Sequence, residues 1–476
     1  MLLTACVHAP SVDGVSGTSP APNATWTPPA AAPRDTARAA APAAIPSDIG
    51  QRIQSLTLGD IVDLALRNNP ATRISWENAR AAAAAYGSRK GAYFPTIDGE
   101  ITGTRLKTVA TQGRAAVQQT TYGGSLTLTY LLLDFGGRSG NVEAAKQALI
   151  AADWTHNATI QSVVLQVEGA YFDYMATKAL LAAQRTTVEE ARTNLAAARE
   201  RHRVGLGTIA DELQAKTALS QAQLDAETTE GTLQTARGAL AVSMGLPANL
   251  PYDISQPAGS PPLSIVADSV DTLIARALQS RPDLAAAEAD SAQARADVSA
   301  ARAARLPSLQ LTGTGARTYL KSLPNGGNSY TVSLGLSIPI FAGFSRAYNQ
   351  MLAESQAQAA AARLDQVRQQ VIFDVFSSYH TLLTATRRVS TADDLLASAQ
   401  ESEQVALARY RAGVGTVLDL LAAQSALASA RAQQVQARWI WQTAMAQLAH
   451  DTGVLDVHGG SRLRLAPAPT DTTSQR

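Results

Sequence analysis

Two halves of this chain carry the same sequence pattern, and this internal repeat restricts the possible folds more than any other feature. Pro70 and its neighbours match Pro282 and its neighbours at an offset of 212 residues. Further along, the offset becomes 208, and residues 203–213 match residues 411–421. The change of four residues falls between two strand-like segments, where a hairpin loop tolerates a longer insertion. The pattern predicts two tandem structural repeats.

Each half predicts the same order of elements. A helical stretch comes first, at residues 58–89 and again at 270–305, and ends at a proline-led segment. Two strand-like segments follow, and then a helix of unusual length. Residues 141–204 contain no proline, so this helix would span roughly 95 Å. A Gly-x-Gly turn then reverses the chain into another long helix, and recurring small residues favour coiled-coil packing.

The strand-like segments alternate between apolar and polar residues. Residues 96–104 have this period of two, and so do residues 125–132, 309–312 and 332–338. Unpaired strand edges in lipid cost several kcal/mol each, so four strands per chain would not close a barrel. We therefore predict an α+β membrane protein: a trimeric 12-stranded β-barrel, with four strands per chain, continued by a long α-helical barrel. The alternative is a soluble sheet packed on one face.

These patterns divide the chain into five parts. A Pro/Ala-rich tether, for which we expect no core of its own, is followed by the first repeat, a linker, the second repeat and a C-terminal tail. Their predicted bounds are residues 1–50, 51–246, 247–269, 270–455 and 456–476.

Composition excludes several classes of protein. The chain has 40 Lys and Arg against 39 Asp and Glu, so no basic surface for a nucleic-acid partner is expected. No run of 18 apolar residues is present, which argues against a membrane-spanning helix. A chain with this pattern would be held in a membrane by its strands or by a covalently attached lipid.

The single cysteine, Cys6, excludes an intramolecular disulfide. Residues 3–6 have the pattern of a lipobox, in which a peptidase cleaves before a cysteine that carries acyl chains. Only Met1, Leu2 and Leu3 stand where a charged start and an apolar stretch are required, so we expect the given start to lie inside the signal peptide, and a chance match is the alternative. We predict lipidation of Cys6 and anchoring in outer-membrane lipid.

The sequence carries no pattern typical of a catalytic, metal or cofactor site. The six histidines lack metal-ligand spacing, and no Gly-rich phosphate loop follows a strand. We therefore expect no catalytic residue, no metal site and no cofactor.

Four motifs together resemble the TolC-type outer-membrane factors over nearly all of residues 50–455. They are RYRAGVGTVLDLLAAQSALASA at 409–430, its echo RHRVGLGTIADELQAKTALSQA at 201–222, and the pair LLLDFGGR and PIFAGFSR at the strand ends. The resemblance implies a homotrimer with a barrel in the outer membrane and a helical tunnel across the periplasm. It also implies a periplasmic adaptor protein and an inner-membrane efflux pump as partners, and a passive duct for small toxic compounds or drugs. The alternatives are a lipid-anchored coiled-coil scaffold and a type I protein-secretion duct.

The two Gly-x-Gly turns are the predicted adaptor contact, because glycine backbones admit close approach by a partner. The predicted contact residues are Gly205, Leu206, Gly207, Thr208, Gly413, Val414, Gly415 and Thr416.

Asp419 matches an acidic position that rings the periplasmic constriction in the family. A second acidic position of the family is Ala422 here, and a basic residue of some members is replaced by Gly415. The resemblance thus implies one acidic ring. The alternative is a helix-end charge stabilised by the helix dipole, which better explains Asp211 in the first half.

Overall fold

The computed structural model describes residues 19, 21–26, 56–107, 118–255, 264–320, 326–456, 460–461 and 465–467. These residues belong to two compact units. The sheet unit takes residues 78–153 and 285–366, and the helical unit takes the described parts of 19–77, 154–284 and 367–476. Cys6, most of the predicted tether and most of the predicted tail lie outside the described residues.

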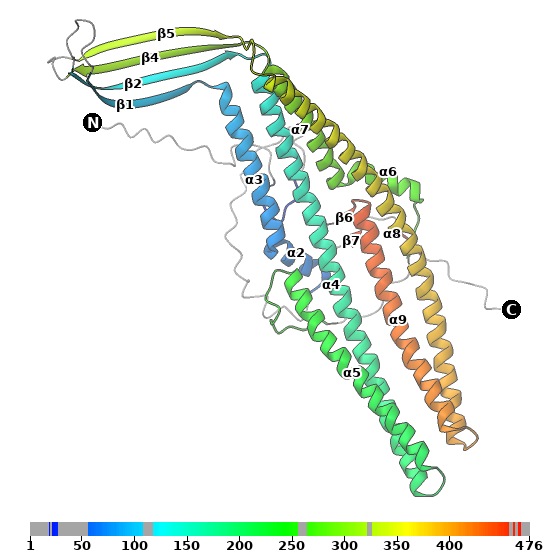
Figure 1. The fold of residues 1–476 in the computed structure, drawn as a ribbon. Helices are drawn as coiled ribbons and strands as arrows, with labels where there is room; N and C mark the ends of the chain where they lie inside the picture. Colours follow the sequence, from blue (N-terminus) through cyan, green and yellow to red (C-terminus); the bar gives the residue numbers. More distant parts are fainter. Residues whose placement is uncertain are drawn as a thin grey trace. The chain divides into compact units, whose positions relative to one another are not determined.

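The sheet unit contains four antiparallel strands, which Figure 1 shows side by side in the order β1, β2, β4, β5. Each strand is longer than the segment predicted from the sequence. Within the described residues, β1 and β5 are the edges of this sheet. The strand bounds are Thr96–Lys107, Gln118–Leu133, Ser308–Leu320 and Gly327–Ser337.

The register of the sheet separates apolar and polar side chains onto opposite faces. Leu311 lies opposite Leu334 on one face. Thr127 lies opposite Thr314 on the other, with 3.3 Å between the two hydroxyl oxygens. The apolar face is open to solvent in the single chain, and Leu334 is 63% exposed. The predicted alternation is confirmed, and a contiguous apolar surface of this kind normally marks a contact with a partner or a membrane.

Aromatic side chains gather where the strands meet the helices. Four of the seven phenylalanines of the chain lie here and are exposed. Phe135 and Phe344 have φ angles of 48° and 65°, a backbone region that residues other than glycine rarely adopt. These reversals begin the long helices that follow β2 and β5. The exposed aromatic residues at this junction are Tyr93, Phe94, Phe135, Phe341, Phe344 and Tyr348.

Each half of the chain continues into a helical hairpin. In the first half, α4 (Gly137–Arg203) precedes α5 (Ile209–Ser243), and in the second, α8 (Ser345–Arg411) precedes α9 (Val417–Asp451). α4 and α8 have 67 residues each, and α5 and α9 have 35 each. Every bound of the second hairpin is the matching bound of the first moved by 208 positions, which equals the offset between the matching sequences.

The helical hairpins pack through stripes of buried residues that recur every seven positions. This spacing keeps one face of a helix turned towards its neighbour in a left-handed coiled coil. Clusters such as Leu195 with Ala198 and Ala215 join α4 to α5. The buried stripes include Ala215, Ala222, Thr229 and Ala236 in α5, Val375, Leu382 and Val389 in α8, and Leu420, Leu427, Trp441 and Leu448 in α9.

The prediction of one helical stretch at the start of each half is wrong in one respect, because each stretch consists of two helices. The first half has α2 (Leu58–Asn68) and α3 (Pro70–Lys90), and the second has α6 (Val270–Ser280) and α7 (Pro282–Ala303). The residue before each proline is extended, with ψ of 126° at Asn69 and 123° at Arg281. The proline ring clashes with a helical residue before it, so the helix ends there.

Short elements complete the described chain. A 3₁₀ turn at Gly91–Tyr93 leads from α3 to β1. Two small pairs of strands join β3 (Ser264–Val266) to β8 (Leu465–Pro467) and β6 (Leu455–Asp456) to β7 (Gly460–Ser461).

Candidate functional site

The turns that close the two helical hairpins have the same backbone hydrogen bonds. Gly205 and Leu206 donate back to carbonyls of the last helical turn at 3.0 and 2.8 Å, and Gly413 and Val414 do so at 3.1 and 3.0 Å. Gly205 and Gly413 have φ angles of 76° and 75°. Both turns are therefore Schellman motifs, in which the left-handed position favours glycine.

The second glycine of each turn lies close to the helix that has just ended. A Cβ atom at Gly207 would stand 3.3 Å from the Cβ of Arg201, and one at Gly415 would stand 3.1 Å from the Cβ of Arg409. The second turn is thus the tighter of the two, and a side chain at Gly415 would require the helix end to shift.

A threonine then starts the returning helix in both turns. The Thr208 Oγ1 accepts the Asp211 N–H at 3.2 Å, and the Asp211 carboxylate accepts the Thr208 N–H at 2.9 Å. Thr416 and Asp419 make the same reciprocal pair at 3.1 and 3.2 Å. These capping boxes satisfy backbone donors that a helix N-terminus leaves free.

The eight residues predicted as the adaptor contact are thus brought together as two four-residue tips. Two apolar side chains project from the tips without a core partner: Leu206 is 71% exposed and Val414 is 69% exposed. Schellman motifs often bury an apolar residue at this position against the helix, whereas here it faces solvent. The tips therefore offer apolar surface to a partner.

Asp419 and Asp211 have the same local role, so helix capping alone does not distinguish them. Asp419 differs in its surroundings, because it lines a groove together with Arg409. Hydrogen bonds from Thr416, with a smaller contribution from the charge of Arg409, lower the pKa of Asp419 below its ordinary value. Its carboxylate is therefore ionised at neutral pH.

Polar side chains join the two hairpins to each other within the helical unit. The Arg431 guanidinium makes two contacts of 3.0 Å with the Glu190 carboxylate. Arg201 donates to the Tyr410 carbonyl at 3.0 Å and lies over the Tyr410 ring at 4.7 Å. The third contact is a 2.7 Å hydrogen bond between Asn194 and Gln424.

A groove of about 660 Å³ runs along the second hairpin next to its tip. Its walls come from α8 and α9, and small side chains make up much of the lining. The lining carries charges of both signs: Arg409 is positive, and Glu401 and Asp419 are negative. Sequence reasoning missed this groove, because periodicity does not say which helix faces stay uncovered.

Residues 21–26 of the predicted tether dock in the helical unit, a contact that the sequence did not predict. Trp26 is buried and meets the Trp154 ring edge-on at 5.2 Å. The Asn157 side chain accepts the Trp26 N–H at 2.6 Å and donates to the Trp26 carbonyl at 2.7 Å. A lone tryptophan in a Pro/Ala-rich tract was the available signal, because such a side chain gains much by burial.

His156 holds the same segment. Its Nε2 donates to the Ala24 carbonyl at 3.0 Å, and its Nδ1 lies 2.8 Å from the Ser75 hydroxyl. Burial lowers the pKa of His156, against the raising effect of the backbone carbonyls that it contacts. The buried ring is therefore neutral at neutral pH.

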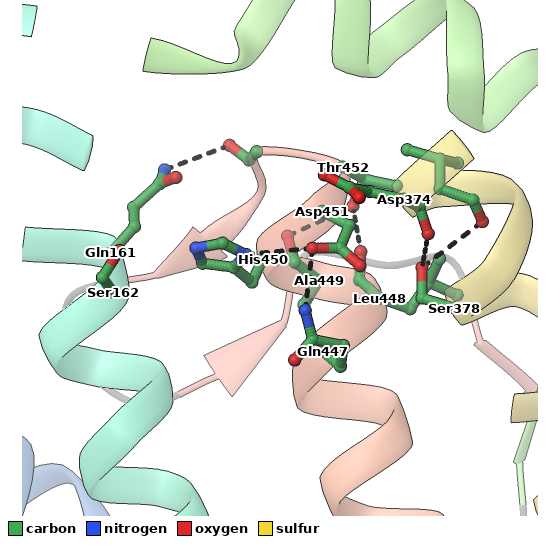
Figure 2. A network of polar contacts seen from close by, with 12 residues as sticks. Gln161, Ser162, Asp374, Ser378, Gln447, Leu448, Ala449, His450, Asp451 and Thr452 are labelled. Atoms are coloured by element: carbon green, nitrogen blue, oxygen red, sulfur yellow. Dashed lines mark hydrogen bonds and ion pairs between the residues drawn. The ribbon is translucent and has the colours of Figure 1, made fainter. Parts of the chain in front are cut away.

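Figure 2 shows a second polar network, at the C-terminal end of α9. The Asp451 carboxylate contacts Gln447 at 2.9 Å and His450 at 3.0 Å. Gln161 of α4 reaches the Gly453 carbonyl at 3.5 Å. These groups have protein partners, so the network ties helix ends together and offers no free ligand set.

The described residues contain no group of three or more His, Cys, Asp or Glu side chains that could hold a metal ion. None of the helices in this part of the chain combines the length and the apolar character needed to cross a bilayer.

Known proteins resemble the chain in sequence and in fold. The profile of the family described as outer membrane efflux protein matches residues 61–246 and 273–454. Protein CyaE of Bordetella pertussis is 30% identical over 396 residues, which cover 81% of either chain. The solvent efflux pump outer membrane protein SrpC of Pseudomonas putida is 28% identical over 379 residues, covering 78% of this chain and 79% of its own.

A solved structure agrees with the fold. The crystal structure of a membrane protein from Pseudomonas aeruginosa superposes with a TM-score of 0.77 at 27% identity. The match covers 88% of this chain and 99% of that one.

Proposed function

The chain belongs to the outer membrane efflux protein family, and from this we propose that it is the outer-membrane exit duct of a tripartite efflux system. It conducts small toxic compounds or drugs passively from an inner-membrane pump and a periplasmic adaptor to the outside. The observation that carries the proposal is a sheet with an exposed apolar face in the same chain as two long helical hairpins. The name of SrpC, a solvent efflux pump protein, supports a small-molecule cargo. The proposal assigns the chain no catalytic reaction.

The sheet supports assembly into a trimer. An apolar face on all four strands suits lipid outside a barrel, and the polar face suits water inside it. Edge strands β1 and β5 leave backbone groups that three copies would pair with one another, giving a barrel of 12 strands. The six exposed aromatic residues at the junction of strands and helices suit the membrane–water boundary, where barrels carry aromatic girdles.

The matching hairpins support the formation of a helical barrel. In our proposal the two halves are tandem structural repeats, so three chains supply six similar hairpins around one axis. The equal helix lengths in the two halves favour this arrangement, because hairpins of one length end at one level.

The tips support docking of the adaptor. Six tips, each with an exposed apolar side chain and a capping threonine, would form the periplasmic end of the tunnel. We assign the adaptor contact to the two four-residue turns, Gly205 to Thr208 and Gly413 to Thr416, because their apolar side chains, Leu206 and Val414, are largely exposed.

We assign Asp419 to the periplasmic constriction of the channel. One ionised carboxylate per chain would place three negative charges around the axis, where they favour passage of cations. The lowered pKa of Asp419 supports this role, because it keeps the group charged at neutral pH. Cys6 is the proposed acylation site, and lipid there would add a second hold on the outer membrane.

Two measurements test the proposed duct. The purified protein should have the mass of a trimer in detergent, after correction for the bound micelle, and should conduct ions in a planar bilayer. Production of the chain together with its adaptor and pump should restore drug resistance to an efflux-deficient strain, and omission of the chain should abolish the effect. A monomer that needs no detergent would refute the barrel.

A further inference from the structure

The junctions from β2 to α4 and from β5 to α8 have the same backbone hydrogen bond (Figure 1). The Gly137 N–H donates to the Asp134 carbonyl at 3.1 Å, and the Ser345 N–H donates to the Ala342 carbonyl at 3.1 Å. The second pair stands 208 positions after the first, which is the offset between the two repeats. The side chains of the two junctions can therefore be compared position by position.

The first junction supplies its own anion. The main-chain N–H of Arg138, in the first turn of α4, donates to the Asp134 carboxylate, and the Arg138 Nε lies 3.6 Å from the same carboxylate. The Arg138 guanidinium also lies over the Tyr93 ring, 5.5 Å from its centre. The positive charge of Arg138 is thus matched by a negative charge of the same junction.

The second junction keeps the arginine and lacks the carboxylate. Arg346 takes the place of Arg138, and Ala342 takes the place of Asp134. At the offset of 212 that holds ahead of the strands, Arg305 takes the place of Tyr93. These three positions have no net charge in the first junction and two positive charges in the second.

Contacts between α7 and α8 bring the two arginines of the second junction close together. The Arg305 Nη1 donates to the Gln350 side-chain oxygen at 2.7 Å, and Gln350 stands one helical turn after Arg346 on the same face of α8. A third arginine, Arg302, makes an ion pair of 2.9 Å with Glu354, one turn further along α8. The Glu354 carboxylate therefore offsets Arg302, whereas the partner of Arg305 is a neutral amide. Arg305 is exposed and Arg346 is half-buried, so both can meet a ligand from outside the chain.

The surroundings of the two arginines indicate the kind of ligand. Phe341 and Phe344 directly precede α8, are 75% and 68% exposed, and meet edge-to-face at 5.4 Å. In the proposed duct these rings lie at the membrane–water boundary, where aromatic side chains sit at the level of the lipid headgroups. Basic side chains at such a boundary attract anionic headgroups, and the fork of a guanidinium matches the oxygens of a phosphate. A molecule with a phosphate head and an apolar tail suits both features.

We propose that Arg305 and Arg346 bind the phosphate of an anionic phospholipid in the leaflet that faces the periplasm. A phosphate oxygen takes the place that the Asp134 carboxylate has in the first junction, and the acyl chains lie against Phe341 and Phe344. The site rests on the outer-membrane placement of the proposed duct and gives that duct a lipid ligand.

Lipid titration of the purified trimer tests the site. The trimer, stripped of lipid in a nonionic detergent, is titrated with phosphatidylglycerol and in parallel with phosphatidylcholine, and its melting temperature is followed. Phosphatidylglycerol should raise the melting temperature more than phosphatidylcholine does. Arg305→Gln with Arg346→Gln should weaken the apparent affinity for phosphatidylglycerol about 30-fold, the effect expected for two basic side chains at an anionic lipid surface, and should leave the response to phosphatidylcholine unchanged. Arg387→Gln with Arg388→Gln is the matched control, because it removes the same charge from exposed positions about 11 turns further along α8, and it should keep the full response.

A second variant separates loss of the site from failure to fold. Ala342→Asp gives the second junction the carboxylate of the first, so it should abolish the difference between the two lipids while the trimer remains intact. Inorganic phosphate alone should not reproduce the shift that phosphatidylglycerol causes. If phosphate raises the melting temperature as much as the lipid does, the site takes a free anion and the lipid assignment is overturned.

The outcomes for the lipid site and for the proposed duct are distinct. A wild-type trimer that responds equally to the two lipids, or a double arginine variant that keeps the full response to phosphatidylglycerol, overturns the lipid site and leaves the duct standing. A wild-type chain that is monomeric and needs no detergent contradicts the proposed duct itself.

Discussion

Replacing the exposed apolar side chains at the hairpin tips should disconnect the duct from its adaptor without unfolding it. The test variant combines Leu206→Asp with Val414→Asp. Neither side chain has a core partner, so each change should alter the stability of the chain by no more than about 0.5 kcal/mol. An aspartate at these positions offers a partner a charge that it would have to desolvate.

The expected loss of affinity follows from the exposed fractions. Full burial of a leucine or valine contributes about 1.5–3 kcal/mol. Because 71% of Leu206 and 69% of Val414 is exposed, cover by a partner would contribute about 1–2 kcal/mol for each side chain. Loss of both contacts per chain amounts to about 2–4 kcal/mol, which weakens binding about 30-fold to 1,000-fold.

The assay compares three readouts. Drug susceptibility of an efflux-deficient strain reports transport, titration of the purified trimer with its adaptor reports the dissociation constant, and a melting curve reports folding. Val242→Asp is the matched control, because Val242 is 57% exposed but lies at the other end of α5. The control should leave all three readouts unchanged. If the tip variant folds, binds the adaptor as tightly as wild type and restores full resistance, the tips are not the contact.

The remaining predictions concern the constriction, the lipid and the docked segment. In planar bilayers, Asp419→Ala should weaken both the cation selectivity of the channel and its block by a trivalent cation, whereas Asp211→Ala should change neither property. Equal effects of the two substitutions would show that both residues only cap helices. Intact mass of the mature protein, made with its complete signal peptide, should show acyl chains on Cys6, and Cys6→Ser should remove them but leave the trimer; an unmodified Cys6 would refute the lipidation. Because burial lowers the pKa of His156, the docked segment is favoured fully above the ordinary histidine pKa of about 6.5 and loosens as the pH falls below it. Amide exchange in residues 21–26 should therefore be faster, relative to an unstructured peptide, at pH 5 than at pH 7.5, and His156→Gln should remove that difference; equal protection at both pH values in the wild-type chain would refute this role.

Features that depend on residues close together in the sequence could be predicted from the sequence. The two capped turns follow from glycine and threonine at set spacings, since only a few backbone conformations suit those residues. The two-faced strands follow from an alternation that a sheet preserves in every strand. The breaks before Pro70 and Pro282 also had a local signal, which the helical period of the surrounding residues obscured.

The tertiary structure decided which surfaces meet. A seven-residue stripe shows that a helix packs, but several long helices with similar stripes could pair in more than one way. The contact between Glu190 and Arg431 and the burial of Trp26 against Trp154 join residues far apart in the sequence, and the groove beside Asp419 is open because no other helix of the described chain covers it. Such contacts depend on how whole helices are placed against each other. Capping geometry gives Asp211 and Asp419 one local role, and only the uncovered groove beside Asp419 separates them.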